Sequence, residues 1–138
     1  MKYLLDTNVL SECVKTTPNV SLLDHLEKHT DEIVTAAPVW HELQYGCLRL
    51  PKSRKRTLIE SFLNDVVRKT MLILPYDDSA AEWHAAERVR LSSKGKTPPF
   101  VEGQIAAIAR INNLILVTRN VEDYKTFSGL KTENWYRV

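Results

Sequence analysis

Short apolar runs alternate with longer amphipathic stretches along the chain. The apolar runs are typical of buried strands, and the stretches between them repeat apolar residues every three or four positions, the period of a helix. Strands are expected at residues 2–5, 32–35, 71–75 and 114–117, with a last one near 132–135. Because strands separated by helices need right-handed crossovers, the pattern predicts an α/β fold with a mostly parallel sheet of four to five strands.

The predicted helices follow from the apolar spacing and from residues that favour helix termini. Thr7 or Asn8 would cap the first helix, and Thr35 would cap the third, with Pro38 in its first turn. The helices are expected at about 7–13, 20–29, 36–50, 53–69, 79–93, 100–111 and 121–127.

Composition places the chain among globular proteins of one domain. It has 138 residues, of which 43% are hydrophobic and 26% charged, and this length fits a single domain over 1–138. The apolar runs are shorter than the ~18 residues that a membrane span needs, and Asp6 interrupts any signal-peptide layout. We therefore expect a cytoplasmic protein without membrane contact. Cys13 and Cys47 lack C-x-x-C spacing, so neither a disulfide framework nor a zinc knuckle is expected.

Charge alone does not identify a partner. Nineteen basic and seventeen acidic residues give a net charge of +2, too small to mark a nucleic-acid-binding protein. The distribution is more informative, since "PKSRKRTL" (51–58) gathers Lys52, Arg54, Lys55 and Arg56. This run is either a surface that contacts phosphates or a solvated helix face.

Acidic residues collect near the ends of the predicted strands. Asp6 directly follows the first strand, and Glu42 lies in the second turn of the helix after the second strand. Glu102 shares its helix face with apolar residues three, four and seven positions on, so it points toward the sheet. Ligands of parallel sheets bind outside the carboxyl ends of the strands. The topology therefore brings these three acids toward one edge. Taken alone, Asp6 is as well explained by a helix cap, and Glu42 and Glu102 are better explained by ion pairs with Lys or Arg.

Such a cluster needs a counter-charge. Two carboxylates ~4 Å apart repel by about 4 kcal/mol at an effective dielectric constant near 20. No matching set of basic residues stands at the same strand ends, so a bound divalent cation is the simplest neutraliser of Asp6, Glu42 and Glu102. An all-oxygen ligand set favours Mg²⁺, with Mn²⁺ as the alternative.

Four segments of the chain resemble PIN-domain ribonucleases, and most closely the VapC-type toxins of bacterial toxin–antitoxin pairs. They are "LLDTNVLSE" (4–12), "VWHELQYG" (39–46), "PPFVEGQIAAIA" (98–109) and "LVTRNVEDY" (116–124), in the family's order and at about its separations. The resemblance implies a PIN-like α/β/α sandwich. It also implies endonucleolytic cleavage of RNA with Mg²⁺ or Mn²⁺, leaving a 5′-phosphate and a 3′-hydroxyl.

By position, Asp6 and Glu42 match the first two acids of this family. Asn120 and Asp123 fall in the motif that supplies or supports a fourth, so the catalytic set implied is Asp6, Glu42, Glu102 and Asp123. The family usually has Asp where this chain has Glu102, and the additional methylene moves the carboxylate by over ~1 Å. A misplacement of ~1 Å can cost about 100-fold in rate, but Glu still ligates Mg²⁺.

Further roles follow from this hypothesis. Thr7, Asn8, Thr118 and Asn120 would hydrogen-bond the metal ligands or a water molecule, and Lys52, Arg54 and Arg56 would contact the RNA backbone. The resemblance implies a cognate antitoxin over the acidic site, a homodimer, and toxin–antitoxin hetero-oligomers.

Two alternatives remain open from the sequence. The first is a catalytically weakened PIN-like module that binds RNA or protein without cleavage, which Glu102 would explain. The second is a phosphate-accepting receiver domain, but that class needs a Lys near the end of a late strand, where this chain has Thr118 and Arg119.

Overall fold

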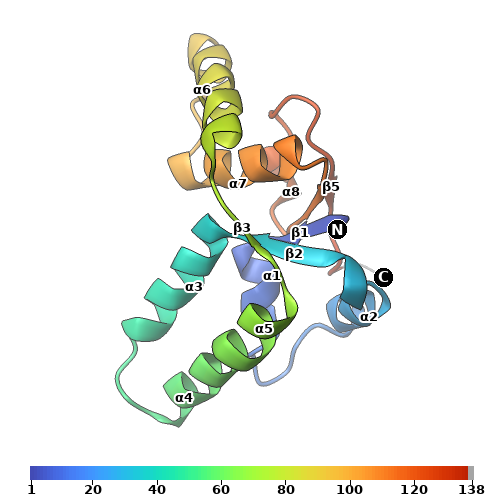
Figure 1. Cartoon of the computed structure of the whole chain (residues 1–138), viewed down its shortest axis with the longest axis vertical. Helices are drawn as coiled ribbons and strands as arrows, with labels where there is room; N and C mark the ends of the chain where they lie inside the picture. The colour runs from blue at the N-terminus through green and yellow to red at the C-terminus, as the bar shows by residue number, and fades with distance from the viewer. Residues whose placement is uncertain (137–138) are drawn as a thin grey trace.

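Five parallel strands form one sheet in the computed structural model, which describes residues 1–136 (Figure 1). The strand order is β3-β2-β1-β4-β5, and all four pairings are parallel. This confirms the α/β class and the expected number of strands. The domain predicted over 1–138 includes two final residues that lie outside the described ones. The strands are β1 (Tyr3–Leu5), β2 (Ile33–Ala36), β3 (Ile73–Leu74), β4 (Ile115–Val117) and β5 (Thr132–Glu133).

Helices cover both faces of the sheet, as an all-parallel sheet requires (Figure 1). One face carries α1 (Thr7–Glu12), α2 (Val20–Lys28), α3 (Ala37–Leu48), α4 (Arg54–Ser61) and α5 (Arg68–Thr70), and the other carries α6 (Asp78–Ser93), α7 (Phe100–Ile111) and α8 (Val121–Tyr124). A short 3₁₀ helix, η1 (Thr30–Glu32), leads into β2. The α/β/α sandwich expected from the sequence is therefore confirmed.

The order of the strands reverses between β1 and β4. From β1 the chain proceeds outward to β2 and β3, then returns to the other side of β1 to form β4 and β5. Leu5 pairs with Val117, and the N–H of Asp6 donates to the carbonyl oxygen of Val117 over 3.0 Å. The residues after β1 and β4, Asp6 and Thr118, therefore lie side by side at the point where such sheets bind ligands.

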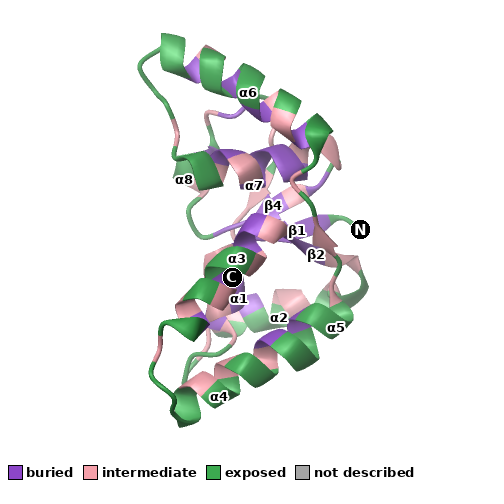
Figure 2. Cartoon of the chain, turned by 60° about the vertical axis from the view of Figure 1, so that its left-hand side comes forward, coloured by how far each residue is buried: buried purple, intermediate pink, exposed green. Residues whose placement is uncertain are grey.

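The core lies between the sheet and the inward faces of the helices, and the outer faces of α4 and α6 are exposed (Figure 2). Leu4 and Leu5 are fully buried. On α7 residues 105–109 are buried without a break, and the small Ala106, Ala107 and Ala109 among them let the helix lie close to its neighbours. Between residues 1 and 136, no helix combines the length and the apolar character needed to cross a membrane.

The segment 53–69 is largely helical, as predicted, but the residues predicted to face the core are wrong. The four-residue spacing of Leu58, Phe62 and Val66 predicts an inward face, yet Leu58 is 64% and Val66 43% exposed. A π-helical segment, η2 (Phe62–Val67), separates α4 from α5. The inward residues are instead Ile59, which packs against the core, and the buried Leu63 and Val67. The face is therefore displaced by one residue already in α4, before the π-helical segment begins.

Two predicted caps are also wrong. Thr35 belongs to β2, where its hydroxyl donates to the carbonyl oxygen of Leu5, and α3 begins after Ala36 without a side-chain cap. The cap of α1 is Asp6 rather than Thr7 or Asn8. The acid after β1 is therefore a helix cap and also lies at the switch point of the sheet.

Candidate active site

A pocket of about 500 Å³ lies at the switch point of the sheet. Its walls come from the start of α1, from α3, from the first turns of α7 and from the segment after β4. The polar residues that line it are Asp6, Thr7, Asn8, Ser11, Glu42, Glu102, Asn120 and Tyr124. The structure thus brings the three predicted acids into one pocket, while no Lys, Arg or His among the described residues lines it.

Asp6 is fixed by hydrogen bonds to both of its carboxylate oxygens. Oδ1 accepts the backbone N–H of Thr7 over 2.8 Å, and Oδ2 accepts the hydroxyl of Thr118, also over 2.8 Å. The residue is only 5% exposed, and burial raises the pKa of its carboxyl, which the bonds from Thr118 and Thr7 partly offset.

Glu42 is tied to Asp6 through Thr7. The hydroxyl of Thr7 donates to Oε1 of Glu42 over 2.8 Å, while its N–H donates to Asp6. Thr7 therefore links the carboxylate of Asp6, which follows β1, to that of Glu42 on α3. This is the hydrogen bonding to the acids that the sequence predicts for Thr7.

Glu102 lies near the other acids, where burial and charge repulsion disfavour its ionised form. Burial raises the pKa of its carboxyl, and the negative charges of Asp123, Asp6 and Glu42 raise it further. The carboxyl of Glu102 therefore lies within range of the negative charges of three other acids.

The donor set fits a hard divalent cation in chemistry and in charge. Within residues 1–136, however, no three Asp, Glu, His or Cys side chains converge closely enough to enclose an ion. Mg²⁺ does not require such a cage, since it commonly takes one or two carboxylates and keeps several water molecules. The pocket therefore fits Mg²⁺ or Mn²⁺ as an open site rather than a closed one.

Comparison with known proteins identifies the family. The model of the PIN domain matches residues 3–126. The chain belongs to the PIN-domain family. Among curated proteins it is 30% identical to ribonuclease VapC2 of Haemophilus influenzae over 136 residues, or 98% of each chain. It is 28% identical to the tRNA(fMet)-specific endonuclease VapC of Shigella flexneri, again over 98% of each.

Solved structures support the same assignment. FitAcB from Neisseria gonorrhoeae superposes with a TM-score of 0.90 at 27% identity, covering 99% of each chain. VapBC2 from Rickettsia felis, bound to a DNA fragment from its promoter, gives 0.84 at 28% identity, covering 98% of this chain and 99% of the other. The resemblance to VapC-type PIN domains expected from the four motifs is therefore confirmed.

Asp123 reaches this PIN-domain site only indirectly. It is exposed and lines a neighbouring pocket together with Glu102, and it raises the pKa of Glu102 by repulsion. It does not line the pocket that holds Asp6. Its catalytic role stays a prediction.

Asn8 and Asn120 hold the loop after β4. Oδ1 of Asn8 accepts the N–H of Arg119 over 3.3 Å, and the backbone N–H of Asn120 donates to the hydroxyl oxygen of Thr118 over 3.1 Å. The side chain of Asn8 thus binds a backbone N–H and not an acid. Asn120 contacts Asp6 only through Thr118, whose hydroxyl accepts the backbone N–H of Asn120 and donates to Asp6.

Tyr124 is a site residue that the sequence reasoning missed. It is buried against the pocket, and its hydroxyl is a hydrogen-bond partner that lowers the pKa of Asp6. Burial, followed by the charges of Asp6 and Glu102, raises the pKa of Tyr124 itself, so it remains a neutral donor. Its only signal in the sequence is its place beside Asp123 in the last family motif.

The three basic residues predicted to bind RNA are not equivalent. Arg54 is exposed and lines a pocket that shares Ser11 with the acidic pocket, and Lys52 is exposed as well. Arg56 instead donates to Oε1 of Glu60 over 2.7 Å and to the carbonyl oxygen of Leu50 over 3.0 Å. Nε and Nη1 of its guanidinium are therefore engaged within the fold, which leaves Arg56 less available to a phosphate than Arg54.

Proposed function

We propose that this PIN domain is a Mg²⁺-dependent endoribonuclease and the toxin of a toxin–antitoxin pair. The observation that carries the proposal is the gathering of Asp6, Glu42 and Glu102 in one pocket without a lining cation. Ribonuclease and endonuclease are the named activities of the VapC relatives, which match the chain over almost its full length.

In this proposal Asp6 and Glu102 would hold Mg²⁺ or Mn²⁺, with Glu42 beside them. Such an ion lowers the pKa of water and stabilises charge on a phosphate group. The residues of the chain position the carboxylates. Thr7 and Thr118 orient the carboxylates through the bonds described above, and the burial of Asp6 limits the access of bulk water to its oxygens.

The test is cleavage of a cellular RNA pool by the purified protein with Mg²⁺ or Mn²⁺, followed by mapping of the ends. We expect 5′-phosphate and 3′-hydroxyl ends, and loss of cleavage on addition of a chelator. Asp6→Asn keeps the helix cap but removes the charge, and should abolish cleavage. Asp24→Asn, at an exposed position on α2, is the matched control and should cut as the wild type does. An Asp6→Asn protein as active as wild type would end the proposal.

One observation favours a second candidate. Because no three acids enclose an ion among the described residues, and Glu102 stands where the family usually has Asp, the chain would instead be a weakened PIN-like module that binds RNA or protein. Comparing wild type with Glu102→Asp separates the two. An inactive wild type that Glu102→Asp activates supports the module, whereas an active wild type supports the nuclease.

The proposal includes a cognate antitoxin, in keeping with the VapBC2 and FitAcB neighbours. A small apolar pocket between α1, α3 and η2 includes Leu10, Leu43 and Phe62 and shares Ser11 and Glu42 with the acidic pocket. An antitoxin segment lying there would cover the acids. Equimolar antitoxin should suppress cleavage and protect the amides of α1 and α3 from hydrogen exchange. Homodimerisation and larger toxin–antitoxin assemblies stay predictions.

A further inference from the structure

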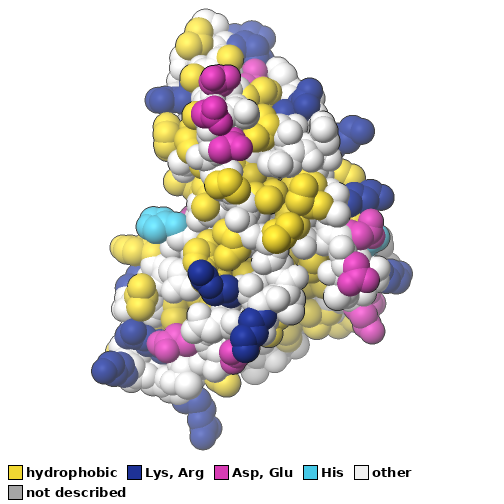
Figure 3. Space-filling model, viewed as in Figure 1, with side chains coloured by type: hydrophobic (Ala, Val, Ile, Leu, Met, Phe, Trp, Pro, Cys, Tyr) yellow, Lys and Arg dark blue, Asp and Glu magenta, His cyan; other side chains and the backbone are white. Residues whose placement is uncertain are grey.

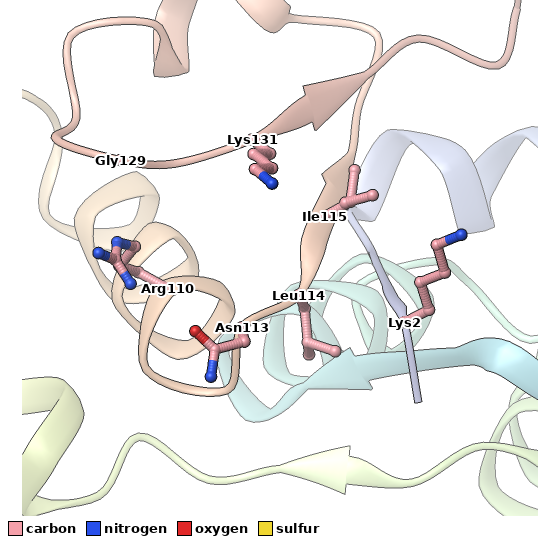
Figure 4. A pocket seen from close by; sticks show the side chains of 7 residues that line it. All are labelled: Lys2, Arg110, Asn113, Leu114, Ile115, Gly129 and Lys131. Atoms are coloured by element: carbon pink, nitrogen blue, oxygen red, sulfur yellow. The ribbon is translucent and has the colours of Figure 1, made fainter.

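A second polar pocket, of about 340 Å³, lies at the opposite, amino-terminal ends of the strands (Figure 4). Lys2 stands just before β1, Ile115 begins β4, and Lys131 stands just before β5. The end of α7 supplies Arg110 and the loop after it supplies Asn113. The pocket is therefore built by three stretches that are distant in the chain, around residues 2, 110–115 and 129–131, and it is separate from the acidic site.

The charge of this pocket is entirely positive. Three of its lining residues are cationic and none is acidic. Lys131 directs its side chain into the pocket (Figure 4), whereas Lys2 places its ammonium over the ring of Tyr3 at 5.3 Å from the centroid and so contributes mainly its stem. Within residues 1–136, neither Arg110 nor Lys131 forms a salt bridge.

Arg110 is packed tightly and is not neutralised by the rest of the described chain. Gly129 has a φ of +69°, and a β-carbon there would lie 2.8 Å from Nε of Arg110. The backbone of Gly129 thus covers the guanidinium, and Nε is buried without a hydrogen-bond partner among the described residues. A partly buried cation with no counter-charge is unfavourable, so an anion in the adjacent pocket would stabilise it.

The end of α7 does not account for these cations. Arg110 lies in the last turn, where a positive charge is favourable. The terminal carbonyl oxygens are already satisfied, however. Ile108 accepts the side-chain amide of Asn112 over 2.8 Å, and Ala109 accepts the N–H of Leu114 over 2.9 Å. Lys131 comes from another segment altogether and has no part in ending the helix.

On the molecular face shown in Figure 3, the Lys and Arg side chains of the described residues are scattered, some within the face and others along its outline. Two cations that line one concave site are different, because their fields add in a pocket partly shielded from water. The volume is at the lower end of the ~300–1,000 Å³ typical of small-molecule sites. There is room for a phosphate group with part of the molecule that carries it.

We propose that this pocket binds a phosphate group between Lys131 and Arg110, with Asn113 as a polar neighbour. A phosphate carries up to two negative charges, which two cations match, and Arg and Lys are the side chains that commonly bind it. The group belongs either to the RNA backbone or to a small phosphate compound. The proposal does not depend on nuclease activity, because it is tested by binding.

The first experiment titrates pyrophosphate into ¹⁵N-labelled protein at constant ionic strength, with a chelator present to remove divalent metal. The backbone amides of Gly129 and Lys131 should shift and saturate. Lys131→Gln should weaken the affinity about tenfold, the effect of losing one hydrogen bond to a charged group. The matched control is Lys69→Gln, at an exposed Lys on α5, which should bind pyrophosphate as wild type does.

Two results would overturn the proposal. One is a titration without saturable shifts at Gly129 and Lys131, and the other is equal affinity in wild type and Lys131→Gln. Acetate at the same ionic strength should give weak shifts. Equal binding of acetate and pyrophosphate would show a general anion effect, and this too contradicts a phosphate site.

A second arm identifies the source of the phosphate. RNA binding is measured in the Asp6→Asn background with and without Lys131→Gln, over a range of salt concentrations. If the RNA backbone occupies the pocket, Lys131→Gln should lower the slope of log affinity against log salt by about 0.7, one phosphate contact of a single strand. An unchanged slope together with pyrophosphate binding assigns the pocket to a small phosphate compound.

Discussion

The hydroxyl of Thr118 donates to Oδ2 of Asp6 over 2.8 Å and so joins the ends of β4 and β1. These are the two strands between which the order of the sheet reverses. The same hydroxyl oxygen accepts the N–H of Asn120, so one threonine fixes both the acid and the loop beside it. The position of Asp6 thus depends on contacts with residues more than a hundred positions away.

Replacing Thr118 by Val should weaken cleavage most strongly at low pH. Burial raises the pKa of Asp6 and the Thr118 hydroxyl lowers it, so removing that donor raises the pKa further. Fewer molecules then carry the ionised Asp6 at a given pH, and the acid limb of the pH–rate profile should move to higher pH. The rate should fall by about 10–100-fold, as is common for groups that orient a metal ligand.

Thr118→Ser is the matched control, because it keeps the hydroxyl and removes only a methyl group. Its pH–rate profile should follow that of wild type. If Val and Ser at this position shift the acid limb equally, the hydrogen bond to Asp6 is not the cause.

Asp6→Asn should stabilise the metal-free protein at neutral pH while abolishing cleavage. The pKa of Asp6 is raised in the folded state above the ordinary 3.8, so the folded state holds the proton more tightly than the unfolded state does. The contribution of Asp6 to the stability of the wild type is therefore fully present below pH 3.8, and it is lost as the pH rises through the folded-state pKa. Asn escapes this loss and remains a good helix cap.

The measurement is the melting temperature in the presence of a chelator. A gain of about 2–8 °C, the shift expected for ~1 kcal/mol in a domain of this size, should appear at neutral pH and vanish below pH 3.8. Asp24→Asn, the exposed control on α2, should leave the melting temperature unchanged. A loss of stability at neutral pH would contradict the assignment of a raised pKa to Asp6.

Apolar runs located the strands because each short strand is covered on both faces and therefore has little polar character. They did not locate the strand ends. Leu72 lies in the predicted third strand but is 63% exposed, and β3 contains only Ile73 and Leu74. The π-helical turn in η2 could not be predicted either, since it depends on whether each backbone N–H bonds to the carbonyl four or five residues earlier, which the composition does not determine.

Some residues of the site could be predicted from the topology of the sheet, and others depend on tertiary contacts that the sequence does not show. The gathering of Asp6 and Glu42 was predictable, because the strand ends meet at one edge of the sheet. Tyr124 was not, since its role depends on where its hydroxyl lies in the fold. Arg56 was assigned to RNA although Glu60 stands four positions on, a spacing at which helix side chains form ion pairs.

The two arginines of α4 should respond differently to replacement by Ala. Arg54→Ala should leave stability unchanged and reduce RNA affinity, lowering the salt slope by about 0.7 if it contacts one phosphate. Arg56→Ala removes bonds to Glu60 and Leu50 and should cost about 1 kcal/mol in the free energy of unfolding. Filter binding and urea unfolding measure the two quantities. A loss of RNA affinity confined to Arg56→Ala would reverse the assignment.

Gly103→Ala should destabilise the protein and disturb the site. A β-carbon at Gly103 would lie 2.1 Å from Nε2 of His84, a fully buried side chain of α6 whose Nδ1 is hydrogen-bonded to the hydroxyl of Tyr76 over 2.8 Å. Helix α7 must then move away from α6, at a cost of ~1–3 kcal/mol typical of overpacking. Since Glu102 precedes Gly103, cleavage should fall too.

The matched control is Gly46→Ala in α3, where a β-carbon would meet nothing within 4 Å. Alanine there should stabilise the helix by about 0.5–1 kcal/mol, so the two glycine substitutions should have opposite signs in urea unfolding. Shortening His84 removes the clash. Gly103→Ala combined with His84→Ala should therefore be less destabilised than the sum of the single changes, by about 0.5–3 kcal/mol. Strict additivity would show that contact with His84 is not what excludes a side chain at Gly103.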